Sequence, residues 1–278
     1  MKSIVLMGGL GNQLFQIFNL IAYCKRYNYD FQFQYSDQLT IGITRPTYWN
    51  TFLEKIKIYT NNNLPKLPSN RELQFHYSEI PNINTPVIFF GYYQSYKYFQ
   101  DQYDKIIEMI ELSNQKSIIL QKYQEICDYD NTISIHFRIG DYIDKQEHHP
   151  LLDIKYYINS INNIIDKTNN KQWNILYFNQ KEDNELVFEK IQVLKNIFPD
   201  IEFIKSPDTI DDWEQMLQMS NCRHNIIANS TFSWWGAYFN NHEDKIVCYP
   251  DIWFGPAQGN KYMGDLFPEK WDKICLNI

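Results

Sequence analysis

The second half of the sequence alternates short apolar segments with longer segments of helical character, and this alternation limits the possible fold more than any other feature. The segments that we predict as strands are Thr132–Phe137, Trp173–Phe178, Ile201–Ile204, Asn225–Ala228 and Ile246–Tyr249. The predicted helices are Ile154–Asp166, Glu182–Ile197, Thr209–Ser220 and Ser233–Phe239. Alternating strands and helices form parallel sheets joined by crossover helices. The sequence therefore predicts the α/β fold class.

The first half repeats this pattern less regularly. Its predicted elements are a strand at Ser3–Met7, a helix from about Asn12 to Arg26, strands at Phe31–Tyr35 and Val87–Phe90, and a long helical segment that runs towards Glu125. The stretch Thr60–Ser69 is predicted as a loop because it is rich in Asn and Pro. Because the pattern breaks near residue 125, we predict two α/β domains, residues 1–125 and 126–278.

The charge of the chain argues against a protein that binds nucleic acid. The sequence has 33 acidic and 26 basic residues and a formal net charge of -7, whereas nucleic-acid-binding proteins normally carry a basic face. An anionic ligand must therefore be held by a few well-placed arginines and backbone N–H groups rather than by overall charge.

The cysteines and the N-terminal segment favour a protein that stays in the cytoplasm. The five cysteines are scattered and form no Cys-x-x-Cys pair, which is typical of reduced thiols rather than of disulfides or a zinc site. Glycine and amide residues interrupt the apolar N-terminal segment, so no run reaches the roughly 18 residues that a membrane span needs. The segment also lacks the small-residue cleavage site of a signal peptide. We expect no membrane span.

The first candidate site is the sequence HFRIGDY, which runs from His136 to Tyr142 at the end of a predicted strand. In open parallel sheets, ligands bind at the carboxyl ends of the strands. Alternation along the strand places His136 and Arg138 on the same face, and an arginine is well shaped to hold a phosphate through two hydrogen bonds. A salt bridge from Arg138 to Asp141 within a tight turn is an equally good interpretation of these residues alone.

The second candidate is ANSTFSWWG, residues 228–236, which follows another predicted strand. We expect Ser233 or a neighbouring hydroxyl to cap the helix that begins there, while Trp234 and Trp235 pack that helix onto the sheet. Helix N-termini bind anions through free N–H groups and hydroxyls. The residues predicted to contact the ligand are Asn229, Ser230, Thr231, Phe232 and Ser233. Alone, the motif also fits a capped buried helix, but two anion-ready segments at one edge favour a diphosphate.

The third candidate is the sequence GGLGNQLFQ near the N-terminus, which partly resembles a dinucleotide-binding turn. Leu14 occupies the third glycine position and no acid ends the next strand at the usual distance, so we expect no nicotinamide or flavin cofactor. Gly9 and Gly11 nevertheless indicate close approach of the backbone to a ligand, and Asn12 and Gln13 offer amide hydrogen bonds. A plain strand-to-helix turn is the alternative.

Three further polar motifs give weaker signals, and we predict no metal site. The sequence DYD, with Asp128 and Asp130, precedes a strand, so it lies at the opposite edge of the sheet and is interpreted as a solvated turn. The sequence EHHP, residues 147–150, lies in a polar loop. Asp211 and Asp212 are interpreted as acids in the first turn of a helix, where the helix dipole favours them.

Taken together, the motifs resemble those of the α-1,2-fucosyltransferases of glycosyltransferase family 11. The similar stretches are GGLGNQLFQ, GYYQSYKYF at Gly91–Phe99, HFRIGDY, the block from Met216 to Asn240, and YPDIWF at Tyr249–Phe254. These stretches span nearly the whole chain and keep the order of the family. The block from Met216 to Asn240 is the most specific of them.

The resemblance implies a GT-B fold, in which two Rossmann-like domains face a central cleft. It also implies GDP-L-fucose as the donor on the C-terminal domain and a glycan acceptor on the N-terminal domain. Transfer would invert the sugar and form an α-1,2 linkage to a galactoside, without a metal or other cofactor. Two departures bear on the donor. Ile139 stands where many members have a second arginine, and Asn179 and Gln180 stand where the family tends to have acids, so either Asp183 replaces them or the nucleotide contact differs.

Three residues of HFRIGDY are the candidate catalytic residues. Arg138 is expected to neutralise the leaving diphosphate, so electrostatic stabilisation would contribute most to the rate. His136 and Asp141 are both candidates for the base. Two other functions stay open at this point: a transferase for another nucleotide-activated deoxysugar, and a sugar-binding protein without turnover, which an aromatic content of 17% would also suit.

Overall fold

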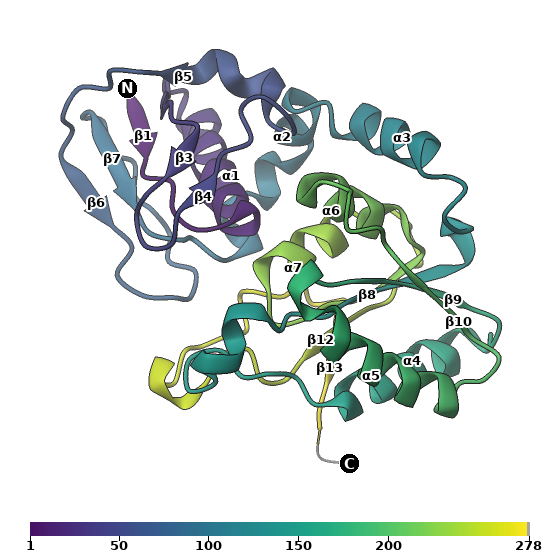
Figure 1. The fold of residues 1–278 in the computed structure, drawn as a ribbon. Helices are drawn as coiled ribbons and strands as arrows, with labels where there is room; N and C mark the ends of the chain where they lie inside the picture. Colours follow the sequence, from purple (N-terminus) through teal and green to yellow (C-terminus); the bar gives the residue numbers. More distant parts are fainter. Residues whose placement is uncertain (277–278) are drawn as a thin grey trace. The chain divides into compact units, whose positions relative to one another are not determined.

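The computed structural model describes residues 1–276, and residues 277–278 of the predicted second domain lie outside this range. The chain divides into two compact units (Figure 1). Unit 1 consists of Met1–Gln115 together with Lys261–Glu269, and unit 2 consists of Lys116–Asn260 and the chain from Lys270 onwards. The division falls at residues 115–116, whereas the sequence pattern placed it at 125–126. The chain also returns to unit 1 near its C-terminus, which the pattern did not indicate.

Unit 2 is built on a six-stranded sheet in which every strand is parallel to its neighbours. Its strands are β8 (Thr132–His136), β9 (Asn174–Phe178), β10 (Glu202–Lys205), β11 (His224–Ile226), β12 (Val247–Pro250) and β13 (Asp272–Ile274). They lie in the order β10-β9-β8-β11-β12-β13. The chain therefore adds β9 and β10 on one side of β8 and then crosses over to place β11 on the other side. Such a switch point leaves a crevice between the loops that follow the two central strands.

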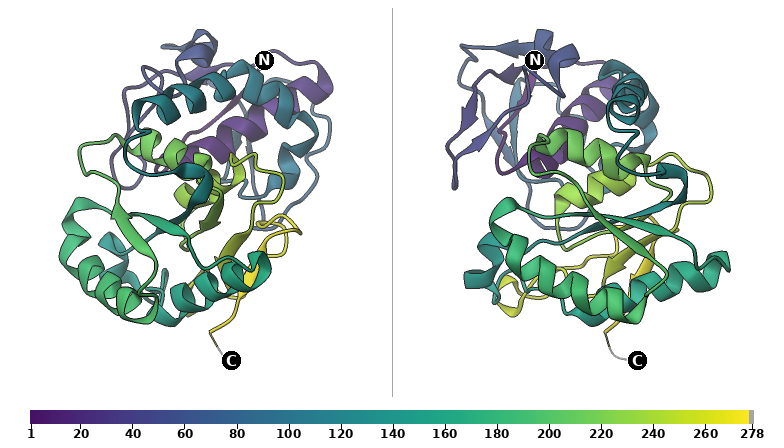
Figure 2. Two further views of the ribbon diagram at one scale, coloured as in Figure 1. Left: turned by 90° about the vertical axis from the view of Figure 1, so that its right-hand side faces the viewer. Right: turned by 45° about the vertical axis from the view of Figure 1, so that its right-hand side comes forward.

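Helices cover both faces of this sheet, as Figures 1 and 2 show. These helices are α4 (Ile154–Thr168), α5 (Asn184–Ile197), α6 (Asp212–Asn221) and α7 (Thr231–Tyr238). Alternate residues of the strands face the two layers. Ile133 and Ile135 of β8 pack in one core with residues of α4 and α5, whereas Leu176 and Phe178 of β9 pack in a second core with residues of α6. Successive side chains of a strand point to opposite faces, and here both faces are covered, as in other parallel sheets.

Unit 1 contains a smaller parallel sheet in the order β1-β7-β6. Its strands are β1 (Lys2–Ile4), β6 (Ser69–Arg71) and β7 (Val87–Phe90), and its main helix is α1 (Leu10–Tyr27). Short pairs form between β2 (Phe33–Gln34) and β5 (Thr60–Asn61), and between β3 (Gln38–Leu39) and β4 (Arg45–Pro46). Helices α2 (Tyr103–Met109) and α3 (Leu112–Lys122) follow. No helix in the described part of the chain is long and apolar enough to cross a membrane.

Short 3-10 helices connect the main elements. They are η1 (Glu54–Tyr59), η2 (Tyr96–Tyr98), η3 (Gln100–Gln102), η4 (Tyr129–Asn131), η5 (Gly140–Lys145), η6 (Lys181–Asp183) and η7 (Pro256–Gln258). Two polar contacts near η2 hold the returning segment of unit 1. Ser95 Oγ donates a hydrogen bond to the carbonyl of Asp265 at 2.6 Å, and Lys97 Nζ lies 2.5 Å from the Asp265 carboxylate.

The predicted α/β fold class with parallel sheets is confirmed, and three local predictions are wrong. The predicted loop Thr60–Ser69 contains β5 and the first residue of β6. The predicted long helix towards Glu125 is divided into α2 and α3, because Glu111 adopts a φ of 51° that a continuous helix does not allow. The first strand ends at Ile4 rather than at Met7. That the two domains face a central cleft stays a prediction.

Helices α6 and α7 pack so closely at Gly236 that a side chain there should destabilise unit 2. A Cβ atom on Gly236 would lie 2.8 Å from the Cβ of Met219, an atom that cannot move without its helix. We expect Gly236→Ala to lower the free energy of unfolding by about 1–3 kcal/mol, as overpacking does, in urea titrations. Gly9→Ala is the control, because Gly9 has a φ of -75° and open space around the Cβ position. An equal loss in both variants would contradict this packing.

Candidate active site

The first two candidate motifs flank the switch point of the sheet in unit 2. Strand β8 runs directly into the sequence from His136 to Asp141, and β11 is followed by the turn from Ala228 to Ser233. The two strands are paired in parallel, with Ile226 opposite Ile135. Their carboxyl ends therefore meet at one edge, as the sequence predicted. This edge of unit 2 is the place where the fold can bind a ligand.

Arg138 is held by three contacts at this edge. Its guanidinium donates hydrogen bonds to the Asp141 carboxylate and to the side-chain oxygen of Gln180, and it lies 4.9 Å from the centre of the Tyr142 ring. The side chain of Arg138 is 16% exposed. The salt bridge with Asp141, which the sequence left as an alternative, is therefore present. It fixes the direction of the guanidinium and offsets part of its charge.

The turn after Arg138 depends on Gly140 and Asp183. Gly140 has a φ of 31°, and a Cβ there would lie 2.3 Å from the side-chain oxygen of Gln180. The Asp183 carboxylate accepts the Gly140 N–H at 2.9 and 3.0 Å. Desolvation by burial raises the pKa of Asp183. This carboxylate therefore holds the backbone of the turn.

His136 is buried and neutral. Its residue exposure is 6%, its ring centre lies 5.5 Å from that of Phe232, and burial together with the positive charge of Arg138 lowers its pKa to about 3. Its Nδ1 atom has no hydrogen-bond partner among the described residues. A group with so low a pKa accepts a proton poorly near pH 7, so the low pKa favours a hydrogen-bonding role over that of a base.

The turn before α7 uses its two serines differently. Ser230 is the N-cap, and its Oγ accepts a hydrogen bond from the backbone N–H of Phe232 at 3.3 Å. Ser233 is buried; its Oγ accepts from the N–H of Ala228 at 3.2 Å and donates to the carbonyl of Ser230 at 3.4 Å. The expectation that Ser233 or a neighbour caps the helix is therefore met by Ser230. Thr231 and Phe232 form the half-buried first turn, which has no acidic residue.

Helix α7 is anchored behind this turn by tryptophans. Trp234 and Trp235 are both fully buried. The ring of Trp234 stacks on Tyr238 with centres 4.6 Å apart and lies 5.4 Å from Trp271. Aromatic contacts of this kind add to the free energy of burial. The first turn of α7 is therefore presented at the sheet edge on a rigid support.

Three buried polar atoms at this edge have no partner among the described residues: His136 Nδ1, Asn179 Oδ1 and Asn229 Oδ1. His136 is the last residue of β8, Asn179 directly follows β9, and Asn229 lies in the turn after β11. The amide orientations are fixed, because Asn229 Nδ2 donates to the carbonyl of Pro150 at 2.8 Å and Asn179 Nδ2 donates to the side-chain oxygen of Asn184 at 2.7 Å. Buried polar atoms are rarely left unpaired. The three residues lie at the ends of the neighbouring strands β9, β8 and β11, so they can offer polar contacts to a ligand at this edge. Asn179 is an addition, because the sequence marked it only as a departure from the family.

The glycine motif of unit 1 lies at the carboxyl end of β1. Gly9 is the N-cap of α1, and Gly11 is buried in its first turn. The Gln13 side chain is buried and donates to the carbonyls of Gly8 at 3.0 Å and Pro46 at 2.8 Å. Asn12 Oδ1 accepts from Gln94 Nε2 at 2.9 Å, which joins this motif to the GYYQSYKYF segment. Gln13 therefore holds the loop, and open space remains at Gly9.

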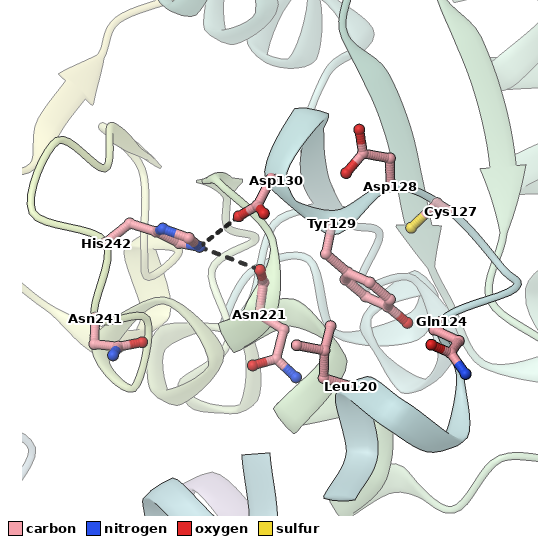
Figure 3. A pocket seen from close by; sticks show the side chains of 9 residues that line it. All are labelled: Leu120, Gln124, Cys127, Asp128, Tyr129, Asp130, Asn221, Asn241 and His242. Carbon is pink, nitrogen blue, oxygen red and sulfur yellow. Dashed lines mark hydrogen bonds and ion pairs between the residues drawn. The ribbon is translucent and has the colours of Figure 1, made fainter. Parts of the chain in front are cut away.

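The DYD motif lies at the amino end of β8, as predicted. Asp128 and Asp130 line a cavity of about 350 Å³ in unit 2 together with His242, whose Nε2 lies 3.9 Å from the Asp130 carboxylate (Figure 3). The described residues include no group of three or more His, Cys, Asp or Glu side chains able to hold a metal ion. In the EHHP loop, the His149 ring stacks on Tyr142 with centres 4.7 Å apart.

Comparison with known proteins finds relatives among the glycosyltransferases. The model of glycosyl transferase family 11 matches residues 1–254. An α-1,2-colitosyltransferase from Escherichia coli is 30% identical over 292 aligned positions, and the alignment covers 97% of this chain and 97% of that protein. A galactoside 2-α-L-fucosyltransferase from Caenorhabditis elegans is 24% identical over 100% of this chain and 80% of its own. The solved structure of a NodZ α-1,6-fucosyltransferase soaked with GDP-fucose has a TM-score of 0.44 and 12% sequence identity. The match covers 84% of this chain and 91% of that chain.

The buried histidines should make the protein less stable in acid. Burial lowers the pKa of His136 to about 3 and that of His224 to about 4. Below the unfolded value near 6.5, the unfolded chain binds protons that the folded chain does not, so the free energy of unfolding falls as the pH falls. Each histidine should contribute about 1.4 kcal/mol per pH unit between 6.5 and its folded pKa.

Urea unfolding of the wild type and His136→Asn between pH 7 and pH 4.5 measures this contribution. Asp183 has a raised pKa and acts in the opposite direction, so the two proteins are compared at each pH rather than across the series. The difference between them should change steadily with pH. A difference that stays constant would mean that His136 is not held neutral by burial.

Proposed function

Because this chain belongs to glycosyltransferase family 11, we propose that it transfers L-fucose from GDP-β-L-fucose to a hydroxyl of a galactoside and forms an α-1,2 linkage with inversion. The observation that carries the proposal is the edge of unit 2, where Arg138, the first turn of α7 and three unpaired buried polar atoms lie at the switch point. A nucleotide-activated sugar supplies the matching chemistry: a diphosphate for the cationic groups and hydroxyls for the unpaired acceptors.

The unpaired atoms favour a nucleotide sugar over a simple phosphate. Asn179 Oδ1 and Asn229 Oδ1 are acceptors, and their orientation is set by the bonds that their Nδ2 atoms donate. A diphosphate at neutral pH presents acceptors only, so it cannot satisfy them. Sugar hydroxyls and nucleobase N–H groups are donors. We therefore assign the two asparagines to the ribose, the base or the transferred sugar.

Arg138 and the N-terminus of α7 are the proposed partners of the diphosphate. Asp141 and Gln180 each accept one hydrogen bond from the guanidinium, which has five N–H donors in total. The remaining donors and the backbone N–H groups around Ser230 and Thr231 would stabilise charge that develops as the glycosyl bond breaks. Asp141 would orient Arg138, and His136 would act as a neutral hydrogen-bonding group. No residue is assigned as the base.

GDP-colitose is a second candidate donor for the same site. The observation that favours it is the similarity to the α-1,2-colitosyltransferase, which covers 97% of each chain. Colitose is L-fucose without its 3-hydroxyl, so GDP-colitose and GDP-L-fucose differ only in that hydroxyl. A site that hydrogen-bonds the 3-hydroxyl would reject colitose strongly, whereas a site without such a contact would take both.

Incubation with GDP-L-fucose, GDP-colitose and a panel of β-galactosides, followed by mass spectrometry of the products, tests the function. We expect a mass gain of one fucosyl unit on the galactoside, at a similar initial rate with Mg²⁺ and with excess EDTA. A severalfold stimulation by Mg²⁺ is compatible with charge screening. If only GDP-colitose is used, the proposed donor is wrong. If the protein binds the sugars without forming product, it is a lectin. Activity that EDTA abolishes and added metal restores would contradict metal-free transfer.

Arg138→Ala should lower kcat/KM by about two to three orders of magnitude, the range for removal of one preorganised donor that stabilises developing charge. Asp141→Asn should cost much less, because asparagine can still orient the guanidinium while its charge is no longer offset. Initial rates with saturating acceptor measure both. Activity of Arg138→Ala within threefold of wild type would make Arg138 a purely structural residue, and complete loss in Asp141→Asn with normal GDP affinity would make Asp141 the base.

A further inference from the structure

Two lysines bind the C-terminal end of α7, the helix whose first turn is the proposed diphosphate site. Lys116 Nζ, from α3, donates to the carbonyl of Phe239 at 2.8 Å and to Asn241 Oδ1 at 2.6 Å. Lys245 Nζ donates to the carbonyls of Ala237 at 2.8 Å and Asn240. Both ammonium groups therefore meet the end of the helix that carries partial negative charge.

Neither lysine has a carboxylate partner among the described residues. Lys116 is only 8% exposed, and Lys245 is half-buried. Lys122 of α3 pairs with Glu214, and Asp244, which precedes Lys245, pairs with Arg223. Burying an ammonium group without a counter-ion is costly. Burial lowers the pKa of both lysines to about 8, so at pH 7 both side chains are largely charged.

The two motifs at the ligand edge of unit 2, by contrast, contribute little free positive charge. The charge of Arg138 is offset by Asp141, the position after it is Ile139, and His136 is neutral. The chain as a whole has a net charge of -7. A donor diphosphate must therefore find additional positive potential elsewhere in unit 2.

We propose that Lys116 and Lys245 form a buried positive pole behind α7 that strengthens the binding of a diphosphate at its N-terminus. They cancel the negative end of the helix dipole, so that its positive end dominates the field at Ser230. An eight-residue helix is about 12 Å long, and charges separated by buried protein are screened less than charges in solvent. Both are positioning residues that act through α7. The inference rests on the proposed function, since it takes the nucleotide donor as the ligand of this edge.

Calorimetry at pH 7 with GDP, GMP and guanosine separates this role from a structural one. In Lys116→Met and Lys245→Met, which keep the length of the side chain, we expect GDP to bind about tenfold more weakly. GMP should lose less, and guanosine should bind within twofold of its wild-type affinity. Lys122→Met is the matched control, because it removes the same charge from α3 but from a half-exposed side chain paired with Glu214. The control should not change GDP affinity.

The outcomes distinguish the two proposals. Unchanged GDP affinity in both lysine variants, or an equal loss for GDP and guanosine, overturns the positive pole and leaves the proposed function intact. A wild-type protein that does not bind GDP overturns both. Where a methionine variant does not fold, Lys116→Gln or Lys245→Gln replaces it, because glutamine still donates to the helix carbonyls without charge. Preserved GDP affinity in a folded glutamine variant also overturns the proposal.

Discussion

The parallel pairing of β8 with β11 is the constraint on which the candidate site depends. Parallel strands end at the same edge, and these two lie at the point where the chain changes direction across the sheet. The turn that holds Arg138 and the turn that starts α7 must therefore meet. Asp183 fixes the first turn through the N–H of Gly140, and Ser230 caps the second. Most of the polar groups at the edge are thus held in place by the fold before any ligand arrives.

The sequence predicted the larger features of unit 2 because they follow from local periodicity. Strands β8 to β12 each contain buried apolar residues, and each predicted segment overlaps the observed strand, although the segment predicted for β11, Asn225–Ala228, begins one residue late and ends two residues late. Strand β13 was missed because Asp272–Ile274 contains only three residues, of which two are charged. The return of Lys261–Glu269 to unit 1 was also missed, since a tertiary contact such as that between Ser95 and Asp265 leaves no periodic trace.

The site itself was predictable to the level of its motifs and not of its atoms. Hydroxyls follow β11 at both Ser230 and Ser233, and the sequence does not distinguish the cap from the residue that ties down the turn. Only coordinates reveal that His136 Nδ1, Asn179 Oδ1 and Asn229 Oδ1 are unpaired. The charge balance also depends on the three-dimensional structure. Arg138 is paired with Asp141, whereas Lys116 and Lys245, which lie outside the motifs, contact the C-terminal end of α7.

The path of the chain through unit 1 has a consequence for how the protein is made. Domains generally fold as they leave the ribosome, the N-terminal one first. Unit 1, however, receives Asp265 and its neighbours only after almost all of unit 2 has been synthesised. Until that segment has been synthesised, Ser95 and Lys97 of the nascent unit 1 lack their contacts with Asp265. Unit 1 therefore gains its last contacts only after the greater part of unit 2 has been made, and unit 2 is completed immediately afterwards, when β13 (Asp272–Ile274) is added.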